Sequence, residues 1–213
     1  MRSKDIEDRK SKLRLTNKQR SLLVGTLLGD GHLETQSQGR TYRLKVEHSI
    51  SQREYTDWLY EQFKDFVHGN IYVKSRQVKG KTFTSCGFTT YSLGLFRFYA
   101  HQFYKEREKL IPKTIKKLID PLALAVWFMD DGSLKSAKHK TYIIHALGYK
   151  KGDLELVKRV FRSKFGIEVK IHRQYDKWRL YVASESAEEF KRLIKPHIIP
   201  AMEYKLGNKM PKE

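Results

Sequence analysis

Two acidic sites stand at matching places in the chain, each at the end of an apolar run and directly before a glycine. One run, within residues 16–29, ends before Asp30, and another, residues 122–129, ends before Asp130 and Asp131. A carboxylate at a helix C-terminus faces the negative end of the helix dipole, which costs about 0.3–1 kcal/mol. Asp-Gly is also a common turn pair. Two copies that each close an apolar helix nevertheless favour a shared chemical role.

That role is metal binding. If the two apolar helices pack side by side, with Gly25 and Gly29 allowing close approach, their ends bring Asp30 and Asp131 together. Two like charges repel unless a hard divalent cation such as Mg²⁺ lies between them. Such an ion activates water and neutralises a leaving oxygen, which is the chemistry of phosphodiester hydrolysis. We therefore predict that Asp30 and Asp131 form a catalytic, metal-binding pair.

The elements that carry these acids are predicted twice in the same order: helix, two strands, helix, two strands, helix. The near-equal spacing of Asp30 to Asp131 and of Gly69 to Gly166 supports a duplication. The first copy is expected at 16–29, 32–48, 55–66, 71–79, 82–91 and 95–103, and the second at 122–129, 135–147, 154–165, 167–174, 178–183 and 186–194. The fold class is thus α+β, with pseudo-two-fold duplicated αββαββα units and two antiparallel four-stranded sheets.

The domain boundaries follow from this duplication. We expect an N-terminal extension at 1–15, a first half at 16–112, a linker at 113–120, and a second half with a C-terminal tail at 121–213. Capping boxes are predicted at the starts of two helices, one from Thr16 and Gln19 and the other from Ser186 and Glu189.

Charge indicates the partner. Lys and Arg number 43 against 24 Asp and Glu, which gives a formal net charge of +19. The basic residues recur throughout the chain among apolar ones, so a folded surface that binds a polyanion is expected. A solvated surface or ribosome-type RNA binding is the alternative that composition leaves open.

Composition excludes other classes. Cys86 is the single cysteine, so neither an intramolecular disulfide nor a cysteine-based zinc site can form. No run reaches the ~20 apolar residues of a membrane span, and residues 1–14 lack the apolar core of a signal peptide. We expect a soluble protein with no membrane partner, and the sequence shows no targeting signal that assigns a compartment.

Residues 23–31 and 124–132 both resemble the LAGLIDADG motif, in which the acid at the eighth position is a metal ligand. The resemblance covers nearly the whole chain and is to the single-chain, two-motif type of LAGLIDADG homing endonuclease. It implies a monomer shaped as a saddle, whose two sheets lie in successive major grooves of double-stranded DNA. It also implies metal-dependent double-strand cleavage of a long, asymmetric target by an intron-encoded enzyme. Mg²⁺ or Mn²⁺ would support cleavage, whereas Ca²⁺ would bind without supporting it.

The resemblance also implies further active-site residues. A lysine from each half supports the reaction in this type of enzyme, and the matching positions are Lys109, before Pro112, and Lys205. Counting within the internal repeat points to Lys117 in place of Lys109. The backbone of Gly29 and of Asp130 is expected to contribute to the metal site.

Basic residues that alternate along the expected strands and turns form the predicted DNA-binding surface. For each of them, a solvated charge or a phosphate contact is a simpler interpretation than a contact with a base. These residues are Arg40, Arg43, Lys45, Lys74, Arg76, Lys138, Lys140, Lys170, His172 and Arg179.

Two positions depart from the family pattern. Val126 stands where the helix seam often has a small residue, and Asp130 is a second acid beside the expected ligand. Asp130 could add a water-mediated contact or point to solvent. His48 and His145 end equivalent strands, and we expect satisfied or solvent-facing histidines there, not an all-histidine metal site.

Two alternatives remain open. One is an intron maturase, which binds RNA on the same fold, so intron RNA is a second candidate partner. The other is a DNA-binding regulator that has lost cleavage. The presence of both acids, Asp30 and Asp131, favours the endonuclease.

Overall fold

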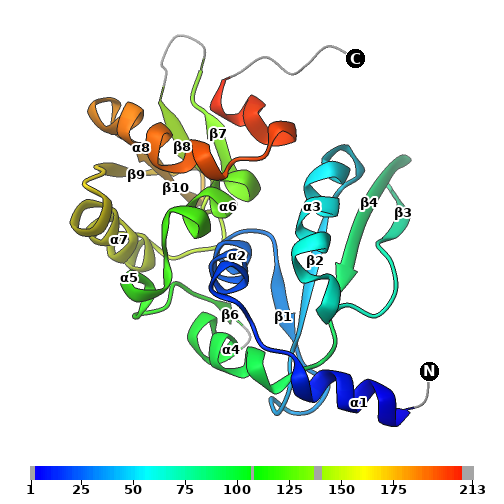
Figure 1. Cartoon of the computed structure of the whole chain (residues 1–213). Coiled ribbons are helices and arrows are strands. Elements are labelled where there is room, and N and C mark those ends of the chain that lie inside the picture. The colour runs from blue at the N-terminus through cyan, green and yellow to red at the C-terminus, as the bar shows by residue number, and fades with distance from the viewer. Residues whose placement is uncertain (1–2, 107, 137–140, 208–213) are drawn as a thin grey trace. The chain divides into compact units, whose positions relative to one another are not determined.

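The computed structural model of the chain describes residues 3–106, 108–136 and 141–207 (Figure 1). By its internal contacts the chain divides into two compact units. The first consists of Met1–Arg20 and Asp30–Ala100, and the second of Ser21–Gly29 and His101–Glu213. The second unit therefore includes most of the first motif helix as well as the second motif helix.

Each unit carries one four-stranded antiparallel sheet. The strand order is β1-β2-β4-β3 in the first and β7-β8-β10-β9 in the second, which is the same order in both. The predicted α+β fold with two four-stranded antiparallel sheets is confirmed, and the identical topology is what a duplication produces.

The first copy of the repeat follows the predicted order. It is preceded by a short N-terminal helix, α1 (Ser3–Lys12), which the sequence did not predict. The repeat elements are α2 (Asn17–Leu28), β1 (His32–Glu34), β2 (Arg43–Ser49), α3 (Arg53–Phe63), β3 (Tyr72–Val78), β4 (Lys81–Thr89) and α4 (Arg97–Phe103). Short 3-10 segments precede α3 and α4, at Ile50–Gln52 and Gly94–Phe96, and another follows α3 at Lys64–Phe66.

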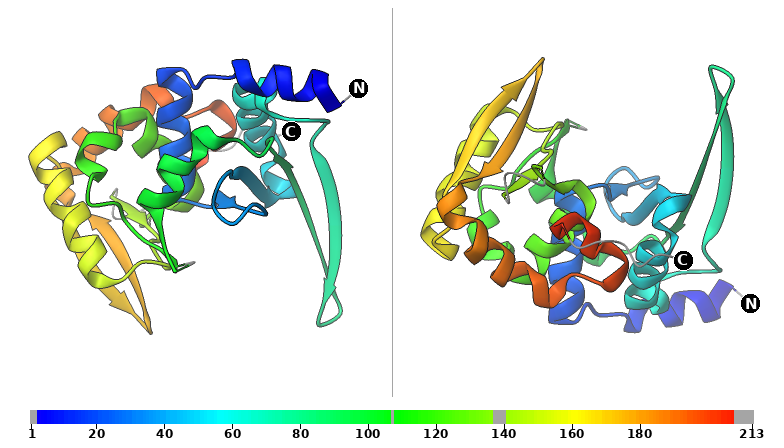
Figure 2. Two further views of the ribbon diagram at one scale, coloured as in Figure 1. Left: turned by 90° about the horizontal axis from the view of Figure 1, so that it is seen from below. Right: turned by 90° about the horizontal axis from the view of Figure 1, so that it is seen from above.

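The first sheet has one covered and one accessible face. Along β2, Leu44, Val46 and His48 are buried, while the residues between them remain partly accessible. Helix α3 covers the buried face with Leu59 and Phe63 among its buried residues (Figure 1). The long β3–β4 hairpin projects beyond the other two strands of this sheet (Figure 2). The accessible face of the first sheet therefore extends along the whole β3–β4 hairpin, where a partner can contact it.

The predicted capping box at the start of α2 is confirmed. The backbone N–H of Gln19 donates to Thr16 Oγ1 at 3.2 Å, and the backbone N–H of Thr16 donates to Gln19 Oε1 at 3.0 Å. These reciprocal bonds satisfy two backbone donors at the helix start, so the sequence fixes where α2 begins.

The second copy repeats this order. Two short strands, β5 (Tyr104–Lys105) and β6 (Glu108–Lys109), and a short helix, α5 (Ile115–Leu118), come before it. The repeat elements are α6 (Pro121–Asp131), β7 (Gly132–Leu134), β8 (Tyr142–Ile144), α7 (Lys151–Val160), β9 (Val169–Gln174), β10 (Lys177–Val182) and α8 (Ala187–Ile194). A π-helical turn, Phe161–Phe165, extends α7, and 3-10 segments include Lys195–His197 and Pro200–Leu206.

Helix α6 is the centre of the second unit's core. Its residues from Ala123 to Asp130 are buried. Trp127 and Phe128 make edge-to-face contacts with rings from other elements of this unit, including Phe161 and Phe190. The N-cap is Asp120, whose side chain accepts from the backbone N–H of Ala123 at 2.8 Å. This core fixes the position of the second acidic site.

Two details of the second copy differ from the prediction. The first strand of its hairpin begins at Gly132, not at 135, because the chain turns directly from α6 into the sheet. The second capping box is wrong: Ser186 Oγ accepts from the backbone N–H of Glu168 at 3.0 Å, and Glu189 pairs with Arg192. Ser186 is thus used to join α8 to the strand region.

Within the described residues, no helix is long and apolar enough to cross a membrane.

Candidate active site at the paired motif helices

The two motif helices are in close contact inside the second unit. A Cβ atom placed on Gly25 of α2 would lie 2.6 Å from Val126 Cβ and would also meet the carbonyl oxygen of Ala123, both on α6. A Cβ atom on Gly29 would lie 2.7 Å from Asp130 Cγ. Only glycine leaves room for such an approach. The prediction that these glycines allow the helices to pack side by side is confirmed, and Figures 1 and 2 show α2 beside α6.

This packing explains the two departures from the family pattern. Val126 fits the seam because it faces Gly25, so a larger residue on one helix meets the smallest residue on the other. Asp130 is buried and its carboxylate packs against Gly29. Its side chain therefore does not point to solvent, which was one of the two orientations left open.

Two lysines reach the carbonyl groups at the ends of these helices. Lys109 Nζ donates to the carbonyl oxygen of Gly29 at 2.7 Å. Lys205 Nζ donates to the carbonyl oxygen of Asp130 at 2.8 Å and also to that of Met129. Each lysine thus binds the carbonyl oxygen of the residue directly before the eighth-position acid, and Lys205 binds that of Met129 as well. Ammonium groups at helix C-termini offset the negative end of the dipole, so they supply the compensation that an acid at this position requires.

The choice between Lys109 and Lys117 has a structural basis. Lys109, on β6, reaches the end of α2, whereas Lys117 is exposed on α5. Lys109 and Lys205 therefore occupy equivalent positions at the ends of the two motif helices.

Asp131 is anchored within the second unit. Trp127 Nε1 donates to Asp131 Oδ2 at 3.1 Å, and the backbone N–H of His145 donates to the Asp131 carbonyl oxygen at 2.9 Å. These bonds come from α6 itself and from the end of β8, so the side chain and the backbone of Asp131 are both held.

Asp30 belongs to the first unit and is exposed there. One of its carboxylate oxygens and a ring nitrogen of His48 lie within 4.8 Å of each other. His48 is buried, and its Nδ1 shares a 2.9 Å hydrogen bond with Thr56 Oγ1. Since Asp30 and Asp131 lie in different units, their pairing stays a prediction.

Tyr149 is a residue of the site that the sequence did not indicate. Its buried hydroxyl donates to the carbonyl oxygen of Leu28 at 2.8 Å, next to the carbonyl that Lys109 binds. Burial, followed by the negative charge of Asp131, raises the pKa of Tyr149 well above 10.0. The hydroxyl therefore remains a proton donor to the end of α2.

His145 is held between two side chains. Arg179 Nε donates to His145 Nδ1 at 2.9 Å, and His145 Nε2 shares a 2.9 Å hydrogen bond with Ser133 Oγ. Because arginine is always a donor, Nδ1 must accept, so Nε2 carries the proton and donates to Ser133. Burial, followed by the charges of Arg179 and Lys205, lowers the pKa of His145. The expectation of a satisfied histidine holds here, and Arg179 is fixed by it.

The basic residues predicted on the first sheet and its turn are accessible. Arg43 and Lys45 lie on β2 and Lys74 and Arg76 on β3, while Arg40 is exposed in the turn before β2. Two acids share this face with them. Glu34 Oε1 accepts from Arg43 Nε at 2.8 Å, and Glu47 Oε2 accepts from Lys74 Nζ at 2.6 Å. Neither acid was among the predicted DNA-binding residues, although Glu47 follows Arg43 and Lys45 at every second position of β2.

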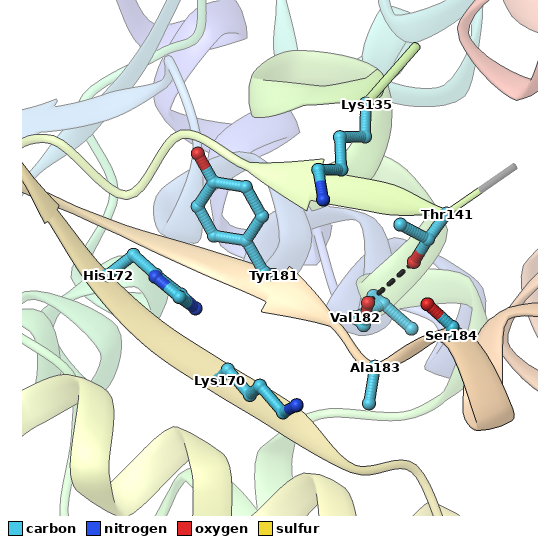
Figure 3. Close-up of a pocket in the computed structure, with 8 residues that line it drawn as sticks. All are labelled: Lys135, Thr141, Lys170, His172, Tyr181, Val182, Ala183 and Ser184. Carbon is cyan, nitrogen blue, oxygen red and sulfur yellow. Dashed lines mark hydrogen bonds between the residues drawn. The ribbon is translucent and has the colours of Figure 1, made fainter. Parts of the chain in front are cut away.

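The second sheet presents a hollow surface (Figure 3). The cross-strand pairs Tyr181–Lys170 and Arg179–His172 place all four side chains on one face. Lys135 also lines the hollow, and its Nζ lies 6.0 Å from the centre of the Tyr181 ring. Lys135 and Tyr181 were not predicted, although Tyr181 follows the same alternation as Arg179. The remaining predicted residues, Lys138 and Lys140, lie outside the described residues.

The two copies of the αββαββα repeat each have a motif helix that ends in an acid and a glycine, with a lysine bound at the helix end. These features define a two-motif protein of the LAGLIDADG class. The model of the LAGLIDADG DNA endonuclease family matches residues 20–190. The chain therefore belongs to this family.

The comparisons with individual proteins agree with that assignment. The chain is 29% identical over 201 residues to cytochrome b mRNA maturase bI2 of Saccharomyces cerevisiae, with 88% of the chain and 47% of the maturase covered. The chain therefore spans about half the length of that relative. It is 27% identical over 213 residues to DNA endonuclease I-ChuI of Chlamydomonas applanata, with 92% and 98% covered. Among solved structures, the homing endonuclease I-WcaI bound to its DNA recognition sequence matches with a TM-score of 0.90 and 26% identity, over 96% of this chain and 92% of that one.

Proposed function

We propose that the chain is a site-specific homing endonuclease, which makes metal-dependent double-strand breaks in a long, asymmetric DNA target as an intron-encoded monomer. The observation that carries the proposal is the pair of helix ends in which Lys109 and Lys205 bind the carbonyl groups before Asp30 and Asp131. The similarity to I-ChuI and to DNA-bound I-WcaI over most of the chain supports the same activity. The charge of +19 suits a polyanionic substrate.

In this proposal, Asp30 and Asp131 hold the divalent cation. The donor set fits a hard cation, because carboxylate and carbonyl oxygens are the ligands that Mg²⁺ prefers. When bound, Mg²⁺ or Mn²⁺ would lower the pKa of a water molecule and neutralise the leaving oxygen. The carbonyl oxygens of Gly29 and Asp130 already accept hydrogen bonds from Lys109 and Lys205. To bind the metal, each oxygen would have to contact the cation beside the lysine ammonium group, or the lysine would have to move away.

The chain's own residues would prepare the site as follows. Lys109 and Lys205 place a positive charge beside each acid, where it stabilises the negative charge that develops on the phosphate. Tyr149 fixes the end of α2 through the carbonyl oxygen of Leu28, and Trp127 fixes the Asp131 carboxylate. Prearranged groups of this kind need no reorganisation during the reaction, which is why they accelerate it.

The first experiment is a cleavage selection on a library of duplex DNA with Mg²⁺, Mn²⁺ or Ca²⁺. We expect discrete double-strand cuts at one asymmetric site with Mg²⁺ and Mn²⁺, and binding without cleavage with Ca²⁺. Asp30→Asn and Asp131→Asn should each abolish cleavage and largely retain binding of the same site. Wild-type protein that binds duplex DNA tightly and never cuts it would contradict the proposal, as would full cleavage by either variant.

A second candidate function is that of an intron maturase. The 29% identity to the yeast cytochrome b maturase is the observation that favours it. Binding of intron RNA, measured against a DNA duplex of the same sequence, separates the two. Splicing assistance that survives in Asp131→Asn, together with an absence of DNA cleavage in the wild type, would favour the maturase.

A further inference from the structure

A carboxylate stands in the middle of the basic, accessible face of the first sheet. Glu47 lies on β2 opposite Gly87, on the same face as Arg43 and Lys45. Its side chain is 29% exposed, so a partner that covers this face can reach it.

Three protein donors hold the carboxylate in place. Lys74 Nζ and Tyr72 Oη donate to Glu47 Oε2 at 2.6 Å and 3.2 Å, and Ser85 Oγ donates to Oε1 at 2.9 Å. Each carboxylate oxygen can accept about two hydrogen bonds. Oε2 is thus filled, while Oε1 keeps one acceptor position, and the side chain is oriented before any ligand arrives.

The protonation states agree with an acceptor role. Burial opposes ionisation of Glu47, but the hydrogen bonds from Lys74 and Ser85 and the charge of Lys74 outweigh it and lower the pKa of the carboxyl. Burial and the charge of Glu47 raise the pKa of Tyr72 to about 12. At neutral pH the carboxylate therefore only accepts, and Tyr72 only donates to it.

Neither stability nor phosphate binding accounts for an acid at this place. An exposed ion pair contributes about 0–1 kcal/mol. A carboxylate on a surface that faces DNA is repelled by the phosphates. Glu47 also forms an ion pair with Lys74, whose ammonium group would otherwise be available to bind a phosphate. None of the four strands of the second sheet contains an acid, so an acid is not a general requirement of the sheet.

The chemistry that a fixed carboxylate recognises in the major groove is the N4 amino group of cytosine. We propose that Glu47 is a specificity-determining residue, whose Oε1 accepts a hydrogen bond from a cytosine in the half of the target that the first sheet contacts. Lys74 then serves mainly to orient Glu47 instead of binding a phosphate. The assignment rests on the proposed function, since it requires this face of the sheet to lie against duplex DNA.

Glu34 is a different case on the same face. It pairs with Arg43 Nε at 2.8 Å, and arginine can still present its other N–H groups to a base or a phosphate. Glu34 therefore orients a donor, whereas Glu47 is itself the acceptor that is oriented.

The test compares base profiles, not overall activity. Every single-base variant of the wild-type target is measured for binding with Ca²⁺ and for cleavage with Mg²⁺, using the wild type, Glu47→Gln and Glu47→Ala. Glu61→Gln is the matched control. Glu61 is an exposed acid that pairs with Lys64, and it lies on α3, which covers the face of the sheet opposite to that of Glu47. We expect the wild type and the control to prefer cytosine at one position by on the order of ten- to a hundred-fold.

The two Glu47 variants should change that position alone. Glu47→Gln should shift the preference there towards adenine, because an amide pairs with adenine N6 and N7. Glu47→Ala should remove the preference there without creating a new one. Base profiles that match the wild type in both variants, with an even change in affinity across all sites, would overturn the assignment and leave Glu47 as a partner of Lys74. A wild type that binds no duplex at all would instead overturn the proposed function, and this assignment with it.

Discussion

Lys205 Nζ lies 2.8 Å from the carbonyl oxygen of Asp130, the residue directly before Asp131. Lys109 Nζ stands in the same relation to Gly29, directly before Asp30, at 2.7 Å. Lys109 lies on a short strand, β6, and Lys205 in the 3-10 segment Pro200–Leu206, yet they reach equivalent carbonyl groups. Each positive charge is thus set at the end of a helix that carries an acid against its own dipole.

Replacing either lysine should slow cleavage. For Lys109→Met and Lys205→Met we expect a loss of about 10²–10³-fold in the rate of cleavage of bound DNA, which is typical for removal of one group that stabilises transition-state charge. Single-turnover cleavage at saturating DNA measures this step apart from binding. Lys117→Met is the control and should cut at nearly the wild-type rate. A strong loss in Lys117→Met with none in Lys109→Met would favour the assignment made by counting along the repeat.

The seam between α2 and α6 should not accept a larger residue. Gly25→Ala places a methyl group 2.6 Å from Val126 Cβ and against the backbone of α6, which cannot move aside cheaply. We expect a loss of about 1–3 kcal/mol or more in the free energy of unfolding, measured by urea denaturation. Gly148→Ala is the control, because a Cβ atom there meets nothing within 4 Å. Equal stability of the two variants would argue against this packing of the helices.

Tyr149 should make part of the stability depend on alkaline pH. The folded-state pKa of Tyr149 lies well above the unfolded value near 10, so the unfolded chain loses this proton first as the pH rises. The stabilisation is complete below about pH 10 and declines as the pH rises from there towards the folded-state pKa. The difference in urea midpoint between the wild type and Tyr149→Phe should therefore shrink between pH 9 and pH 11. A difference that stays constant over this range would contradict the raised pKa.

The capping box at the start of α2 should stabilise the protein locally. Thr16→Ala removes the acceptor for the backbone N–H of Gln19 and should lower the free energy of unfolding by about 0.5–2 kcal/mol. Thr16→Ser keeps the oxygen and should stay close to the wild type. Thermal melts of both variants decide the matter, and equal losses would mean that the methyl group and not the cap matters.

The sequence by itself determined the order of elements, since the 3.6-residue and two-residue periods of apolar side chains in each copy are local properties. It also located the acids of the two motifs and the close approach at Gly25 and Gly29, because small residues in an apolar helix have few other uses. The two accessible, basic sheet faces followed from alternation along the strands for the same reason.

Only the tertiary structure decided which side chains bind the ends of the motif helices and which polar groups pair with one another. Lys109 and Lys205 were named only through the family resemblance, and Tyr149 was not indicated at all. All three reach the helix ends from segments distant in the chain, and no period in the sequence encodes such contacts. Ser186 has the spacing of a capping box but is bound instead by the backbone N–H of Glu168, since a nearby donor competes for the same oxygen. The pairing of Glu47 with Lys74 likewise depends on cross-strand register. Contacts between distant residues are fixed when the chain packs, so the sequence pattern gives the candidates and the folded structure selects among them.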